Sequence, residues 1–200
     1  MKSLEATLKE VVETLRKSDC RFAVAGGVVA NIYRKDIRTT LDVDFLFYTE
    51  KDVDKSAEDV LKTLGLAVGM VKEHQLNRTP AMNKKSQPNL IAIGRRTEAK
   101  NELGVDLLLP SFPWFKSALD RAEKNILDYG FAKVPSVTVE DMILIKLSAG
   151  RSKDLDDLES IFSAEHKLDL DYIESEMKRL KLKVPKSIKS FAPKQLRKIN

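Results

Sequence analysis

The sequence predicts an α/β (α+β) fold, in which helices flank a mixed sheet and a helical part follows at the C-terminal end. Two observations lead to this class. Short apolar runs alternate with amphipathic stretches early in the 200-residue chain, then strands predominate, and the last part is mostly helical. Hydrophobic residues make up 42% of the chain, which is enough for a buried core and argues against disorder.

The first predicted elements form a helix–strand–helix–strand series. Residues 3–18 favour an amphipathic helix, because leucines and valines recur at helical spacing between Glu and Lys. The short apolar run at 20–26 ends in glycine and predicts a strand. Residues 27–35 favour a short helix, and 41–48 predict a second strand.

A third helix is expected over 52–65, with Asp52 or Asp54 as its N-cap and Gly65 as its stop. The apolar residues of 66–75 then favour another strand.

The polar stretch at 76–89 contains two prolines and indicates a loop or hairpin. Two short strands are expected at 90–96 and 104–110, on either side of a polar turn. Residues 111–130 predict a helix that ends at Gly130.

An extended segment interrupted by Pro135 follows at 131–139, and it leads into the helical part. Thr138 or Glu140 lies near the expected start of the next helix. The last predicted helices cover 139–150, 153–164 and 169–183. The expected organisation is therefore an α/β core at 1–135 and a C-terminal helical region with a basic tail at 136–200.

The net charge of +5 is unevenly distributed. Residues 178–200 contain nine Lys or Arg and no acid, which leaves −4 for the rest of the chain. Such a tail favours a solvated, partly frayed end, and the alternative is a surface that attracts nucleic-acid phosphates.

The chain carries no pattern typical of secretion or membrane insertion. No apolar run approaches the roughly 18 residues of a membrane span, and acids and lysines interrupt residues 1–19. Cys20 is the single cysteine, which excludes an internal disulfide. A cytoplasmic location without membrane contact is therefore expected.

Two acids lie within the second predicted strand. Asp42 and Asp44 project from the same face, because side chains alternate along a strand. Two carboxylates this close, among apolar neighbours, repel each other and resist dehydration unless a divalent cation joins them. Asp106, in a later strand, is a candidate third ligand. The alternatives are exposed acids at a strand end for the pair and an edge or turn position for Asp106.

Gly26 and Gly27 end the first predicted strand and begin a helix. Their missing side chains would let a phosphate approach the backbone, although a simple tight turn explains them equally well. The segment 26–31 lacks the later glycine of a dinucleotide fingerprint, and no Gly-Lys-Ser/Thr follows to make a P-loop.

These features together resemble the signature of the DNA polymerase β-like nucleotidyltransferase superfamily. The matching residues are AGG at 25–27, LDVDF at 41–45 and VDL at 105–107. The RTT at 38–40 resembles the abortive-infection type, which includes toxins of type IV toxin–antitoxin systems. A later helix is similar as well, through Lys146, Arg151, Asp154 and Asp157. The resemblance covers about 22–162.

The resemblance implies a nucleotidyltransferase-type sheet and an enzyme that moves a nucleoside monophosphate from a nucleoside triphosphate to an acceptor hydroxyl. Asp42, Asp44 and Asp106 would be catalytic and would bind Mg²⁺ or Mn²⁺. The residues implied in nucleotide binding are Gly26, Gly27, Arg38, Thr39 and Lys146.

Several alternatives stay open. Lys146 could extend from an apolar helix face to solvent. Arg151, Asp154 and Asp157 favour an ion-pair network that packs the helical part on the sheet. The acceptor could be RNA such as a transfer RNA end, a protein hydroxyl or a small molecule, and a cognate antitoxin is a candidate partner. An inactive nucleotidyltransferase-like protein that binds a nucleotide or a partner is the competing class.

Overall fold

The computed structural model describes residues 3–72, 90–95, 103–110 and 112–199. The loop or hairpin predicted at 76–89 lies outside the described residues. The helices are α1 (Leu4–Lys17), α2 (Gly26–Tyr33), α3 (Val53–Thr63), α4 (Phe115–Ala122), α5 (Val139–Ala149), α6 (Ser152–Phe162), α7 (Leu170–Leu180), and the 3-10 helices η2 (Lys186–Ile188) and η3 (Leu196–Lys198). The strands are β1 (Arg21–Ala25), β2 (Asp42–Tyr48), β3 (Ala67–Lys72), β4 (Leu90–Arg95), β5 (Gly104–Leu108), β6 (Ile126–Asp128) and β7 (Lys133–Pro135).

The main sheet is mixed, which confirms the predicted fold class. Within the described residues it has five strands in the order β1-β2-β5-β4-β3. Strands β2 and β5 are parallel, and the other neighbours are antiparallel. The parallel register places Asp44 directly beside Asp106, so the two strands predicted to carry the acids are neighbours.

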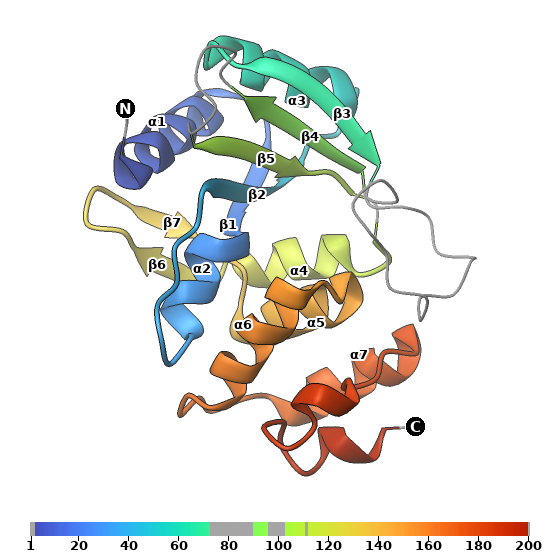
Figure 1. The fold of residues 1–200 in the computed structure, drawn as a ribbon. Coiled ribbons are helices and arrows are strands. Elements are labelled where there is room, and N and C mark those ends of the chain that lie inside the picture. Colours follow the sequence, from blue (N-terminus) through green and yellow to red (C-terminus); the bar gives the residue numbers. More distant parts are fainter. Residues whose placement is uncertain (1–2, 73–89, 96–102, 111, 200) are drawn as a thin grey trace.

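Helices cover the sheet and bury a continuous core. Helices α1 and α3 contact each other and the sheet, whereas α2 and α4 pack near β1 and α5 packs on α2, α6 and α7 (Figure 1). The core includes Phe45 and Phe47 of β2 and Met142 and Ile143 of α5, all fully buried. The sheet and the helical part therefore share one hydrophobic core, and a domain boundary at residue 135 stays a prediction.

Local sequence signals account for several helix ends. The side chain of Asp52 accepts a hydrogen bond from the backbone N–H of Lys55, so it is the N-cap of α3. Gly65, just past the end of that helix, has φ +70°, a conformation that favours glycine. Thr138 caps α5 in the same way as Asp52, by accepting from Asp141 N–H.

The prediction of a helix ending at Gly130 is wrong. Helix α4 stops at Ala122, and the following residues form β6 of a hairpin with β7. Gly130 sits in the hairpin turn with φ +82°, and its N–H donates to the side chain of Asp128. The side-chain amide of Asn125 donates to the carbonyl of Ser136, which ties the two ends of the hairpin together. Tertiary contacts thus override the helical tendency of this stretch.

The basic tail is folded rather than frayed, which corrects the favoured interpretation. Its apolar residues recur every fourth position and are buried, namely Val184, Ile188, Ala192 and Leu196. Most of its Lys and Arg side chains remain exposed. The tail therefore covers part of the helical region while its charges face solvent (red in Figure 1).

Among the described residues, every helix is too short or too polar to cross a membrane.

Candidate active site

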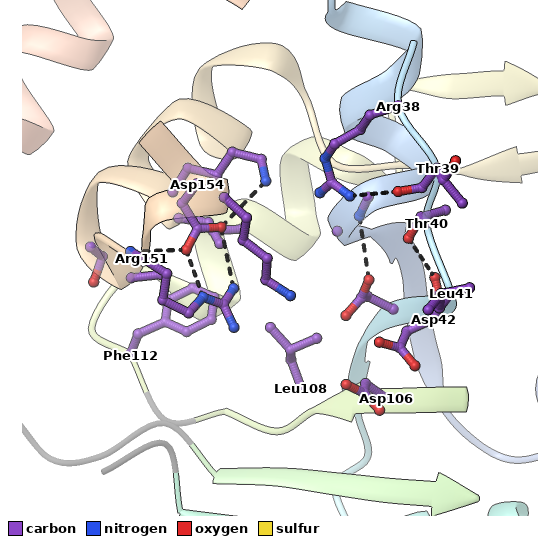
Figure 2. A pocket seen from close by; sticks show the side chains of 18 of the residues that line it. Arg38, Thr39, Thr40, Leu41, Asp42, Asp106, Leu108, Phe112, Arg151 and Asp154 are labelled. Atoms are coloured by element: carbon purple, nitrogen blue, oxygen red, sulfur yellow. Dashed lines mark hydrogen bonds and ion pairs between the residues drawn. The ribbon is translucent and has the colours of Figure 1, made fainter. Parts of the chain in front are cut away.

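A pocket of about 270 Å³ brings together the residues that the sequence singled out. Its walls come from the turn between β1 and α2, the segment before β2, strands β2 and β5, and helices α5 and α6 (Figure 2). Every predicted site residue lines this pocket: Gly26, Gly27, Arg38, Thr39, Asp42, Asp44, Asp106 and Lys146. The structure thus gathers segments that are more than 100 residues apart in sequence.

The sheet contributes the acidic side of the pocket. Asp42 and Asp44 are half-buried and alternate with the fully buried Val43 and Phe45, so both acids share the face that looks into the pocket. Asp106 lies on the adjacent strand in register with Asp44. Neighbouring strands are about 4.8 Å apart. Three carboxylates therefore gather on one small area of the sheet.

The glycine pair makes room for these acids. Gly26 has φ +60°, and a Cβ placed on it would lie 1.8 Å from Oδ2 of Asp44. A Cβ on Gly27 would lie 2.5 Å from Oγ1 of Thr40. The N–H of Gly27 donates to Oδ2 of Asp44 over 3.3 Å. The turn between β1 and α2 needs glycine because β2 approaches it so closely.

The carboxyl group of Asp44 is held in unfavourable surroundings. Loss of water around it, and then the charges of Asp106 and Asp42, raise its pKa from the usual 3.8 to about 6. The N–H of Gly27 and the charge of Lys146 offset this in part. Asp44 has some exposed surface in the pocket, so a positively charged ligand that enters there can reach its carboxyl group.

A buried acid organises the basic side of the pocket. Asp157 on α6 is fully buried and receives two hydrogen bonds from Arg38, at 2.6 Å from Nε and 2.8 Å from Nη2. Lys146 and Arg34 also donate to it at very short range. Burial alone would raise the pKa of Asp157, but hydrogen bonds from Arg38 and the charge of Lys146 hold that pKa well below its usual range.

A second acid on α6 supports the same wall. Asp154 is buried and pairs with Arg151, whose Nε lies 2.6 Å from Oδ2. Nζ of Lys146 lies 3.5 Å from Oδ1 of Asp154, so this lysine joins the two acids of α6. Arg38, Lys146, Arg151 and Lys153 all line the pocket, and Figure 2 shows Arg151 and Asp154 on the helical side, away from Asp42 and Asp106.

These contacts decide between alternatives that the sequence left open for Lys146 and for the acids of α6. Lys146 is only 4% exposed and pairs with acids inside the protein, so the idea that it extends to solvent is wrong. The ion-pair network predicted for Arg151, Asp154 and Asp157 is present, with Lys146 as the link between the two acids. The network ties the segment before β2 to the helical part through Arg38.

Sequence reasoning missed several residues of the site. Arg34 follows α2 and carried no motif; it lies outside the pocket lining, and its role becomes visible only in its contact with Asp157. Phe112 and Trp114 belong to the hydrophobic core, at 9% and 4% exposure, yet they also line the pocket. Leu108 could have been found, because it lies two residues after Asp106 and so shares its strand face.

The acids suit a metal that takes part of its coordination from elsewhere. In the described part of the chain, no group of three or more His, Cys, Asp and Glu side chains is arranged to hold a metal ion. Loss of water and then the neighbouring carboxylates nevertheless raise the pKa of Asp44, at a place in the pocket that a cation can enter. Mg²⁺ often uses one or two protein carboxylates and completes its shell with water and phosphate oxygens. The residues present fit that cation in this mode.

Comparison with known protein families gives a match over almost the whole chain. Residues 4–198 match the model of a protein family described as a nucleotidyl transferase of unknown function. No protein with a curated description matches the chain.

Two crystal structures of Helicobacter pylori proteins are among the similar folds. JHP933 is 15% identical with a TM-score of 0.41, over 86% of this chain and 70% of that one. A protein provisionally named a nucleotidyltransferase is 14% identical with a TM-score of 0.43, over 90% of this chain and 77% of that one. Likeness at this level carries no argument about activity.

Proposed function

Because the chain belongs to the family described as a nucleotidyl transferase of unknown function, we propose that it is a magnesium-dependent enzyme that transfers a nucleoside monophosphate from a nucleoside triphosphate to an acceptor hydroxyl. One observation carries the proposal. The pocket places three strand carboxylates beside a wall of Lys and Arg from the segment before β2, α5 and α6. A metal-bound triphosphate has both the cationic and the anionic features that such a divided pocket would bind.

The basic wall is the proposed phosphate site. Arg38 and Lys146 are held by Asp157, so their charges are in place before a ligand arrives. Five N–H groups of a guanidinium and three of an ammonium exceed what one carboxylate can accept. Arg38 and Lys146 can therefore keep Asp157 as a partner and still donate to phosphate oxygens.

The acidic wall is the proposed reaction centre. Asp42 and Asp44 would hold Mg²⁺, which when bound neutralises charge on the phosphate oxygens. The acceptor oxygen attacks the α-phosphorus, the bond to the β-phosphate breaks, and pyrophosphate leaves. Asp106 lies beside Asp44 and is the proposed acceptor of the hydroxyl proton, while the basic wall stabilises the departing pyrophosphate.

The test is transfer of label from each of the four nucleoside triphosphates, with Mg²⁺, to total RNA or protein of the host. Label is expected in one acceptor fraction with the wild-type protein and not with Asp44→Asn. The matched control is Asp59→Asn, which changes an exposed aspartate of α3 outside the pocket and should transfer normally. Full transfer by Asp44→Asn would overturn the site.

The acceptor is proposed to be RNA. The exposed Lys and Arg side chains of the folded tail suit a polyanion, and the sequence resembles toxins of type IV toxin–antitoxin systems. A cognate antitoxin chain would then be the regulating partner. Co-purification from the host tests that partner, and label in the protein fraction would instead favour a protein hydroxyl.

A second candidate is an inactive relative that binds a nucleotide or a partner. It is favoured by the lack, in the described ranges, of a ready group of three metal-ligating side chains and by the ion pairs that occupy Lys146. The label-transfer assay separates the two, and calorimetric titration of nucleotide with and without Mg²⁺ shows whether a protein without transfer still binds nucleotide. Binding without transfer to any acceptor would support this candidate, and transfer would exclude it.

A further inference from the structure

Five apolar residues line the pocket beside its charged groups and have no part in the phosphate chemistry. They are Leu108 at the end of β5, Phe112 and Trp114 before α4, and Ile145 and Ala149 of α5. We call these five residues the apolar side. Leu108 and Ile145 are half-buried, so each keeps surface that can face a ligand. Ile145 and Ala149 are four residues apart and share one face of their helix.

The apolar side begins next to the proposed reaction centre. Leu108 lies two residues beyond Asp106 on the same strand face, about 6.6 Å further along β5. Figure 2 shows Leu108 and Phe112 on the side of the pocket that continues from Asp106. The apolar residues therefore adjoin the acids, as the base adjoins the phosphates through the ribose in a nucleotide.

Trp114 adds a hydrogen-bond donor that lacks an acceptor. It is 4% exposed, and its Nε1 is buried without a hydrogen-bond partner among the described residues. Its ring packs against Phe112 with centroids 4.5 Å apart. A buried indole N–H normally has a partner, so a tryptophan of the pocket lining with an unsatisfied donor suggests that a ligand supplies the acceptor.

We propose that the apolar side binds the base of the donor nucleotide. The flat heterocycle lies against Leu108 and Ile145. Because Nε1 of Trp114 is buried in the structure, its N–H donates to a ring nitrogen or carbonyl oxygen at the edge of the base once the indole shifts toward the pocket. Apolar walls with one placed polar group are typical of sites that fix a small aromatic ligand. This inference rests on the proposed function, because it assumes that a nucleotide occupies the pocket.

The first test separates the base from the phosphates. Affinity for ATP, GTP, CTP and UTP is compared with affinity for inorganic triphosphate, all with Mg²⁺, in the wild type, Leu108→Ala and Ile145→Ala. Each variant is expected to bind its best nucleotide about tenfold more weakly, which corresponds to about 1.4 kcal/mol, and to bind triphosphate as the wild type does. The control is Leu170→Ala, which truncates a half-buried leucine outside the pocket.

The outcomes distinguish the two proposals. Nucleotide binding that is unchanged in both pocket variants would overturn the base site and leave the proposed function standing. An equal loss in Leu170→Ala would also overturn it, because the effect would then be general. If the wild type binds neither nucleotide nor triphosphate, the proposed function fails as well.

The second test needs no variant. Trp114 is the single tryptophan of the chain, so its fluorescence reports on this side of the pocket. Saturation with the best nucleotide should change the emission of the wild-type protein, and inorganic triphosphate should change it much less. Unchanged emission at nucleotide concentrations that calorimetry shows to be saturating would refute the role of Trp114.

Discussion

Replacing Gly26 with alanine tests the idea that the glycine turn sets the position of Asp44. The new side chain would meet two obstacles. A left-handed backbone costs a non-glycine residue about 1–2 kcal/mol. In addition, the Cβ would lie 1.8 Å from Oδ2 of Asp44, whereas ordinary contact begins at 3.4 Å, so the carboxylate would have to retreat by about 1.6 Å.

Gly65→Ala is the matched control. Gly65 has a similar φ of +70°, and nothing lies within 4 Å of the position that its Cβ would take. This variant should therefore lose about 1–2 kcal/mol of unfolding free energy and keep nucleotidyl transfer. Urea unfolding and the transfer assay measure both quantities.

Gly26→Ala should lose more stability than the control and at least 100-fold in transfer rate, because a displacement of 1 Å in a reacting group can cost that much. If Gly26→Ala matched Gly65→Ala in both stability and transfer, the close approach of Gly26 to Asp44 would not govern the site.

Three further predictions concern charge and the tail. Asp157→Asn should lower the free energy of unfolding by about 3–5 kcal/mol at neutral pH, because it leaves cations without their buried partner. The pKa of Asp157 is lowered in the folded wild type, so its contribution to stability is lost as the pH falls below about 4. The difference in unfolding free energy between wild type and variant, measured with urea, should therefore shrink there. A difference that persists at that pH contradicts the ion-pair explanation. Asp44 has a raised pKa, so wild-type stability without metal should fall as pH rises from about 4 through 6, by at most about 3 kcal/mol. Asp44→Asn should remove that slope in the same assay, and an unchanged slope would place its origin elsewhere. Leu196→Asp should strongly lower the thermal midpoint because Leu196 is fully buried, whereas Lys194→Asp at an exposed neighbour should not; equal midpoints would mean that the tail is not packed.

The sequence predicts elements whose signals are local. The spacing of apolar residues located α1, and a cap followed by a stop glycine located α3, because each signal lies within the element itself. The prediction of a helix ending at Gly130 failed because a glycine in the sequence fits the end of a helix and the turn of a hairpin equally well. What decided between them was the contact of Asn125 with Ser136, which no local pattern contains.

The site residues also differ in whether a local sequence signal could predict their neighbours. Asp42 and Asp44 could be placed on one face because strand alternation is fixed, and Asp106 could be offered as a neighbour because its strand is apolar. The partners of Asp157 could not be paired, because Arg34 and Arg38 precede it by more than 100 residues. Charge partners at that separation follow from the tertiary fold.

The attachment of Arg38 to Asp157 has a consequence for the order in which the chain is made. A ribosome completes β2 early, but the acid that holds Arg38 emerges 119 residues after it. A nascent chain, or a truncated product that ends before α6, has the sheet acids without an organised phosphate wall. The proposed activity would therefore switch on late in synthesis, once the C-terminal third has left the ribosome and folded back onto the segment before β2.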